Sequence, residues 1–262
     1  MGARTRRLVF GEVAELYDAS RPTYPEAIID DLAAWAADGD GPPRALEVGA
    51  GTGKATRLLT QRGVAVLAIE PSPEMAAIAR RSTAASGRVE VRESDFEHTE
   101  LGGRTFPLVY AAQAWHWVTQ PAGYARARAA LRGGGRLVAF WNRPVWGRSA
   151  IRTALDAAYD RYAADMPPGI ARPIDRFDAD EDWVSEIAAA DGFAEPEVRG
   201  YDWSLRYTPA EYVDLITTHS EIRLLADDRR AALLAAVGEA ITANGGVLEL
   251  PMHVRACIAR AH

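Results

Sequence analysis

The chain has 262 residues, of which 48% are hydrophobic and 25% charged, and its formal net charge is −6. This composition is typical of a globular domain with a sizeable core, and the acidic balance argues against a nucleic-acid partner. The single cysteine, Cys257, excludes an intramolecular disulfide. We recognise no secretory leader, myristoylation signal or apolar run of membrane-spanning length, so we expect a cytoplasmic protein without a membrane partner.

Two helices are predicted before the first strand. The stretch LVFGEVAELYDASRP (8–22) predicts a short amphipathic helix that ends before Pro22. Residues 23–38 place Pro25 in a first helical turn and apolar side chains on one face, and the breaker-rich stretch DGDGPP (38–43) follows.

An alternation of strands and helices begins after this linker. It predicts a parallel, doubly wound, Rossmann-like α/β sheet. The glycines at 133–135 predict a break before the fifth strand. The expected strands are 44–50, 64–70, 88–94, 106–114 and 136–142, and the expected helices are 53–63, 72–83 and 121–132.

The remaining third has a different layout, with an α-helical insertion after strand five and strands that complete a seven-stranded, mostly parallel sheet. We expect helices at 149–165, 180–192, 209–225 and 228–243, a loop at 166–177, and strands at 195–208 and 247–261. The chain 1–262 is therefore predicted to be one domain. Its parts are N-terminal helices (10–39), a core (40–145), a helical insertion (146–192) and sheet-completing strands and helices (193–262).

The stretch EVGAGTGKAT (47–56) has three closely spaced glycines and the only lysine of the chain, Lys54. A nucleotide P-loop would need a glycine where Val48 stands and a hydroxyl where Ala55 stands. A dinucleotide loop of the G-x-G-x-x-G type would need a glycine in place of Lys54. Both phosphate-binding interpretations therefore lack required residues, and the upstream acid Glu47 favours a cationic ligand.

The pattern E-x-G-x-G-x-G resembles motif I of the class I S-adenosylmethionine (SAM)-dependent methyltransferases. The resemblance implies SAM as the cofactor, with Glu47 favouring its positive end. It also implies that the loop backbone approaches the methionyl and ribose parts. The residues concerned are Gly49, Ala50, Gly51 and Gly53.

Later strand ends extend this resemblance along one rim of the predicted sheet. Glu70, followed by Pro71, is expected to bind both ribose hydroxyls. The family places an acid, here Asp95, on the adenine amino group and an apolar neighbour, here Phe96, on the ring. Plain core packing is the alternative for Phe96. The end of the fourth strand, with Ala112 and Gln113, is expected beside the transferred methyl group.

A narrower resemblance rests on FGEVAELYDASRPTYP (10–25) and QAWHWV (113–118), which are similar to trans-aconitate methyltransferase-like proteins that act on small molecules. It covers residues 10–145 well, and the last third only in layout. It implies that Tyr17 and Arg21 close over SAM, with Arg21 on its carboxylate. The alternative is a structural cluster at a helix end.

Methyl transfer is an in-line displacement, so alignment of the reacting groups is the main task of the enzyme. His116 is the candidate general base, and the alternative is that its ring packs or bonds within its own loop. Trp115 and Trp117 are candidate pocket walls, with core packing as the alternative. Further candidates for the substrate pocket are Trp141, Arg143, Trp146 and Arg172.

No histidine cluster has metal-ligand spacing, so no metal is expected, and the Asn-Pro-Pro-Tyr motif of base-modifying methyltransferases is absent. We therefore expect methyl transfer to an oxygen, nitrogen or carbon of a small molecule, a carboxylate included. Non-methylating chemistry on the same fold, a SAM-binding partner protein and an NAD oxidoreductase remain alternatives. Monomer and homodimer both stay open.

Overall fold

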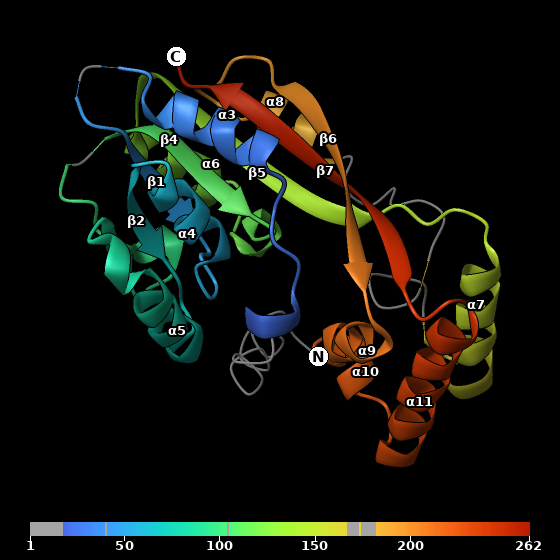
Figure 1. Cartoon of the computed structure of the whole chain (residues 1–262). Coiled ribbons are helices and arrows are strands. Elements are labelled where there is room, and N and C mark those ends of the chain that lie inside the picture. Colours follow the sequence, from blue (N-terminus) through green and yellow to red (C-terminus); the bar gives the residue numbers. More distant parts are fainter. Residues whose placement is uncertain (1–17, 40, 104, 167–172, 174–181) are drawn as a thin grey trace. The chain divides into compact units, whose positions relative to one another are not determined.

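The computed structural model describes residues 18–39, 41–103, 105–166, 173 and 182–262 (Figure 1). It contains a seven-stranded sheet in the order β3-β2-β1-β4-β5-β7-β6. All four pairs among β1 to β5 are parallel, which confirms the predicted fold class. The strands are β1 (Arg44–Val48), β2 (Ala65–Ile69), β3 (Val89–Arg92), β4 (Phe106–Ala112), β5 (Leu131–Pro144), β6 (Glu197–Tyr207) and β7 (Leu248–Arg260).

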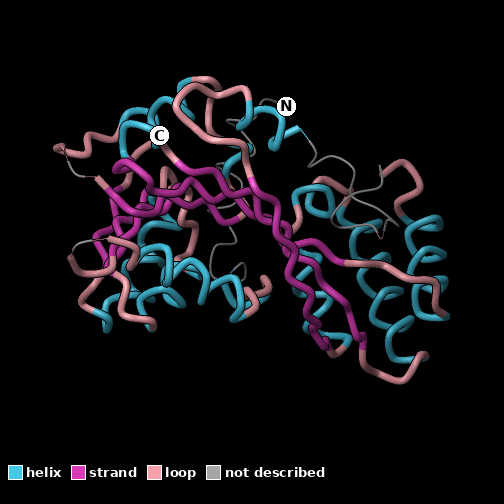
Figure 2. Tube along the Cα trace, turned by 90° about the horizontal axis from the view of Figure 1, so that it is seen from above, coloured by secondary structure: helices cyan, strands magenta, loops and turns pink. Residues whose placement is uncertain are grey.

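The order reverses at β1, which has β2 and β3 on one side and β4 and β5 on the other. Ligands of such sheets bind outside the carboxyl ends of the strands at this point. The last two strands, β6 and β7, lie side by side (Figures 1 and 2) and run in opposite directions, as the arrows of Figure 1 show. A ligand site is therefore expected at the loops that follow β1, β2 and β4.

At the start of some helices a side chain accepts a hydrogen bond from a backbone N–H group. Ser72 accepts a hydrogen bond from Met75 N at the start of α5, and Thr208 and Glu211 form a capping box at the start of α9. The α-helices are α3 (Glu26–Ala36), α4 (Lys54–Gln61), α5 (Pro73–Thr83), α6 (Ala122–Ala130), α7 (Ala150–Tyr162), α8 (Asp182–Ala188), α9 (Pro209–Thr217), α10 (Ser220–Arg223) and α11 (Asp227–Ala243). Three short 3₁₀ turns, η2 (Ala84–Ser86), η3 (Phe96–His98) and η4 (Trp115–Trp117), follow α5, β3 and β4.

The chain divides into two compact units. The sheet unit comprises residues 23–142, 179–201 and 254–262, and the helical unit comprises residues 1–22, 143–178 and 202–253. The helical unit contains α7 together with α9 to α11, so its helices come from two separate stretches of sequence.

Both faces of the sheet unit are buried, as expected of parallel strands covered by helices. One face packs Ile28 and Leu32 of α3 and Leu59 of α4 against the strands. The other packs Tyr124 of α6 and Ile187 of α8 against them. The helical unit has its own core, in which Leu155 of α7 lies among residues of α9 and α11.

The predicted break at residues 133–135 is wrong, because β5 runs through these glycines. Its register with β4 shifts there: Leu131 pairs with Phe106, whereas Arg136 pairs with Leu108. A Cβ on Gly135 would lie 3.0 Å from three backbone carbonyl oxygens, so glycine permits the strands to approach at this irregularity.

None of the helices in the part of the chain that the structure describes is long and apolar enough to cross a membrane.

Candidate functional site

The loop between β1 and α4 is held against the end of β2 by its own backbone. The N–H groups of Gly49 and Ala50 both donate to the carbonyl oxygen of Ile69, at 2.9 and 3.0 Å. Three residues of this loop, Gly49, Gly51 and Gly53, have φ values of +70°, +59° and +84°. Residues other than glycine rarely adopt this left-handed backbone conformation, and this explains why glycines stand at these three positions of the motif.

The three glycines differ in what a side chain would meet. A Cβ on Gly49 would lie 2.5 Å from the Cβ of Ala114, and one on Gly53 would lie 3.3 Å from the Cα of Ala79. Packing therefore excludes a side chain at Gly49, whereas at Gly53 the neighbouring atoms would have to move by a few tenths of an ångström. A Cβ on Gly51 would meet nothing within 4 Å, so this residue exposes its backbone to open space. That arrangement fits a ligand that approaches the backbone closely.

Glu70 directly follows β2 and ties two segments of the site together. Its side chain is buried, with the residue 6% exposed. Oε2 accepts from the N–H of Gly51 and Oε1 from the N–H of Ser72, both at 2.8 Å. Because a carboxylate oxygen accepts more than one hydrogen bond, this geometry is compatible with additional hydroxyl donors such as those of a ribose.

Glu47 lies within β1 and is 1% exposed. Its Oε2 accepts a hydrogen bond of 2.5 Å from the Thr56 hydroxyl of α4. Burial raises the pKa of Glu47 from 4.5 to about 7, and the negative charge of Glu70 adds to the rise, whereas the hydrogen bond from Thr56 opposes it. A cation bound nearby would favour the charged form and lower this pKa.

Asp95 and Phe96 stand at the start of η3, after β3. Asp95 is half-buried, and its backbone oxygen accepts from the Thr99 hydroxyl at 2.8 Å, which holds the turn. Phe96 is buried, and its ring centroid lies 6.2 Å from that of Trp115. Trp115 in turn lies 5.4 Å from Tyr124 of α6, so both Phe96 and Trp115 are part of the core.

The end of β4 is conformationally unusual. Gln113, which follows Ala112, has φ +62° and is the one non-glycine residue with positive φ in the described part of the chain. Its Nε2 donates to the carbonyl oxygen of Asn142 at 3.2 Å, and Asn142 Nδ2 donates to the carbonyl oxygen of Thr23 at 3.3 Å. Such strained conformations concentrate at functional sites. Sequence reasoning missed Asn142, although it ends the apolar run of the fifth strand.

Three tryptophan rings gather around His116 of η4. The indole Nε1–H of Trp141 in β5 donates to Nδ1 of His116 at 3.2 Å. Trp183 of α8 stacks on Trp141 with ring centroids 3.3 Å apart, and Trp117 lies 4.7 Å from His116. His116 itself is exposed, whereas Trp141 is buried. The sequence did not indicate Trp183, because a tryptophan in an amphipathic helix is typical of a core position.

Several predicted site residues belong to the helical unit. Arg21 donates from Nε to the Thr218 hydroxyl at 2.9 Å. Trp146 is buried, with Tyr212 at 6.5 Å and the guanidinium of Arg152 at 5.8 Å from its ring. Arg143 also lies in this unit, whereas Tyr17 and Arg172 lie outside the described residues.

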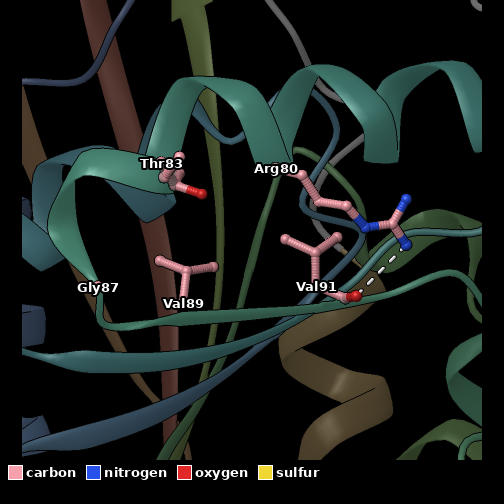
Figure 3. Close-up of a pocket in the computed structure, with 6 residues that line it drawn as sticks. Arg80, Thr83, Gly87, Val89 and Val91 are labelled. Carbon is pink, nitrogen blue, oxygen red and sulfur yellow. Dashed lines mark hydrogen bonds between the residues drawn. The ribbon is translucent and has the colours of Figure 1, made fainter.

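A shallow pocket of about 280 Å³ lies elsewhere, between α5 and β3 (Figure 3). Val89 and Val91 form its floor, and Arg80 extends along it and donates from Nη2 to the carbonyl oxygen of Val91 at 3.4 Å. None of the predicted site residues lines it. The described residues also include no group of three or more His, Cys, Asp or Glu side chains placed to hold a metal ion.

The chain is similar to known methyltransferases in sequence and in fold. Residues 45–135 match a family model described as a methyltransferase domain. An uncharacterised methyltransferase of Mycobacterium tuberculosis is 30% identical over 97% of this chain and 96% of its own length. A structure described as a candidate type II methyltransferase, from Anaeromyxobacter dehalogenans, has a TM-score of 0.64 at 22% identity, over 92% of this chain and 97% of that one. Phosphoethanolamine N-methyltransferase 2 of Haemonchus contortus, solved with S-adenosylhomocysteine, has a TM-score of 0.52 at 15% identity, over 95% of this chain and 56% of that one.

Proposed function

Because this chain belongs to the class I SAM-dependent methyltransferases, we propose that it moves the methyl group of SAM to an oxygen, nitrogen or carbon of a small molecule. The observation that carries the proposal is the pairing of Gly51 with Glu70. An open backbone position and a buried carboxylate lie 2.8 Å apart, joined by a hydrogen bond. This combination suits a ligand with a sugar that carries two hydroxyl groups.

The residues present fit SAM along the whole rim. Glu70 would hold the ribose hydroxyls, with Pro71 beside it, and Asp95 would take the adenine amino group next to the apolar Phe96. Gly49, Ala50, Gly51 and Gly53 would leave room for the methionyl and ribose parts. Ala112 and Gln113 would border the reacting end.

Glu47 would favour the positively charged end of the cofactor from its buried position in β1. Its pKa of about 7 means that both forms are populated near neutrality, and a bound cation would draw it to the charged form. When bound, SAM supplies a methyl group already activated by a sulfonium. The protein then has to align the acceptor and exclude water rather than generate a strong electrophile.

The finer resemblance to trans-aconitate methyltransferase-like proteins forms part of the proposal, with a carboxylate as the favoured acceptor. A carboxylate needs no general base, because it is ionised at neutral pH. In the sheet unit, the candidate residues for the acceptor pocket are Trp117 and Trp141.

Calorimetric titration of the intact chain with SAM tests the proposal, with NAD as the comparison ligand. We expect SAM to bind and NAD not to bind, and Asp95→Ala to weaken SAM about tenfold by loss of one hydrogen-bond acceptor. Transfer from methyl-labelled SAM to a panel of small carboxylic acids, amines and phenols would then identify the acceptor. Absence of SAM binding would refute the proposal, and binding without release of S-adenosylhomocysteine would point to non-methylating chemistry.

A further inference from the structure

The pocket between α5 and β3 combines an apolar floor with a charged side chain. The side chains of Val89 and Val91 point from β3 toward α5 (Figure 3), and both residues are only partly buried. Ala84 and Gly87, which are exposed, also line the pocket. Accessible apolar surface in a concave site favours a ligand with a hydrocarbon portion.

The guanidinium of Arg80 makes only long contacts with its neighbours in the described part of the chain. Its Nη2 donates to the carbonyl oxygen of Val91 at 3.4 Å, and its Nη1 lies 3.7 Å from Oε2 of Glu93. Charge-assisted hydrogen bonds are shorter, at about 2.7–2.9 Å. A guanidinium has five N–H donors, and a carboxylate can accept two of them at once. Arg80 could therefore bind a carboxylate without the loss of a strong contact.

The segment that forms this pocket is positively charged, although the whole chain has a net charge of −6. Residues 80–93 contain four arginines and two glutamates, which gives the segment a formal net charge of +2. These residues are Arg80, Arg81, Arg88, Arg92, Glu90 and Glu93. The two glutamates lie 2.7 Å from Arg92 and 3.7 Å from Arg80 in ion pairs. The local charge therefore favours an anion over a cation.

We propose that the pocket between α5 and β3 is a second ligand site that binds a small aliphatic carboxylate. The hydrocarbon chain lies on Val89 and Val91, and the carboxylate pairs with Arg80. The volume of about 280 Å³ lies just below the usual range for drug-sized ligands, so a chain of about six carbons is the expected size. This site goes beyond the proposed methyl transfer, because none of the residues that would hold SAM lines it.

NMR titration of the nitrogen-15-labelled intact chain with hexanoate tests the proposal, with hexylammonium as the comparison ligand. We expect hexanoate to give saturable shifts at the backbone amides of Thr83, Gly87 and Val89, with a Kd on the order of 1 mM. Hexylammonium has the same hydrocarbon chain and the opposite charge, so it should bind at least about tenfold more weakly. Equal affinity for the two ligands, or hexanoate shifts confined to the loops after β1, β2 and β4, would overturn the proposal.

Two pairs of variants separate the charge of the pocket from its shape. Arg80→Gln should weaken hexanoate by at least about tenfold, whereas Arg44→Gln, at an exposed arginine outside the pocket, should bind as the wild type does. Ala84→Phe fills the pocket and should abolish the shifts. Ala85→Phe is its matched control, because Ala85 is equally part of η2 and exposed but does not line the pocket.

Wild-type affinity for hexanoate in both Arg80→Gln and Ala84→Phe would refute the site. The titration contains no SAM, so its result is independent of the proposed methyl transfer. Failure of the chain to bind SAM would refute the proposed function and leave the hexanoate result standing.

Discussion

The loop after β1 and the helical unit differ in what forms their polar contacts. In the loop, backbone N–H groups of Gly49, Ala50 and Gly51 bond to a backbone carbonyl and to the Glu70 carboxylate. In the helical unit, the predicted site residue Arg21 makes its contact through its side chain, which donates to the Thr218 hydroxyl. A site built from backbone needs glycines at fixed positions, whereas a site built from side chains can be made by many combinations. Only a site of the first kind therefore leaves a recognisable residue spacing in a single sequence.

The largest effect that tests this contrast is expected at Gly51. Gly51→Ala would place a methyl group in the open space beside the loop, and we expect SAM affinity to fall by about 100-fold or more. The free energy of unfolding should fall by only about 1–2 kcal/mol, the cost of a left-handed alanine. Calorimetry with SAM and urea denaturation measure the two quantities.

Gly102→Ala is the matched control for this substitution. Gly102 also has φ +59° and a Cβ there would also meet nothing within 4 Å, but it lies outside the candidate site. The two variants should lose similar stability, and only Gly51→Ala should lose SAM. Equal SAM affinity in both would show that the loop backbone does not approach the cofactor.

The second largest effect concerns the buried acid of β1. A pKa raised from 4.5 to about 7 means that the folded state retains the Glu47 proton more strongly than the unfolded state, by about 3 kcal/mol. Stability from this group is thus present below about pH 4.5 and is lost as the pH rises to about 7. Glu47→Gln stays neutral, so its free energy of unfolding should gain about 3 kcal/mol over wild type between about pH 4.5 and 8.

Glu74 provides a control, because its pKa is shifted in the opposite direction to that of Glu47. Hydrogen bonds from its own backbone N–H and from Ser72 lower the pKa of this exposed carboxyl group. Its contribution to stability is therefore present at neutral pH and lost in acid, so Glu74→Gln should gain nothing on alkaline titration. Urea denaturation across the pH range distinguishes the two variants. Parallel pH profiles for wild type and Glu47→Gln would contradict the raised pKa.

Glu70→Gln should have the next largest effect. One of the two backbone N–H groups, of Gly51 or Ser72, would face an amide NH₂ instead of a carboxylate oxygen. We expect SAM affinity to fall by about 10- to 100-fold, since an unsatisfied donor in a buried site costs about 1–3 kcal/mol. Glu93→Gln, at an exposed acid after β3, is the control and should bind SAM as the wild type does. Unchanged affinity in Glu70→Gln would remove Glu70 from the cofactor site.

The difference between local patterns and contacts of distant residues explains how much the sequence could predict. Buried apolar runs and their alternation with helices identified β1 to β5 and the rim of the sheet, because both follow from local periodicity. The break predicted at residues 133–135 failed, because glycine was interpreted as a chain breaker where it permits a close approach of β4 to β5. Trp183 and Asn142 were missed for a related reason. Their partners, Trp141 and Gln113, are distant in sequence, and no periodic pattern links them.

The smallest expected effect tests the helical unit. The Thr218 hydroxyl accepts from Arg21 at 2.9 Å and donates to the carbonyl oxygen of Leu215 at 2.6 Å, in a buried position. Thr218→Val keeps the shape and removes both bonds, so we expect a loss of about 1–2 kcal/mol of unfolding free energy. SAM affinity should stay within about twofold of wild type, because a guanidinium has further N–H donors to direct at a carboxylate.

Arg21→Ala completes this comparison, because the resemblance to trans-aconitate methyltransferase-like proteins implies a direct contact of Arg21 with the carboxylate of SAM. If Arg21 makes that contact, Arg21→Ala should weaken SAM by about tenfold beyond any effect of Thr218→Val. Calorimetry on both variants separates the roles, since both lose the hydrogen bond between Arg21 and the Thr218 hydroxyl and only Arg21→Ala loses the guanidinium. Equal SAM affinity in the two variants would show that Arg21 has a structural role and makes no contact with SAM. The cofactor site would then be defined by backbone and carboxylates of the sheet unit, with no cation from the helical unit.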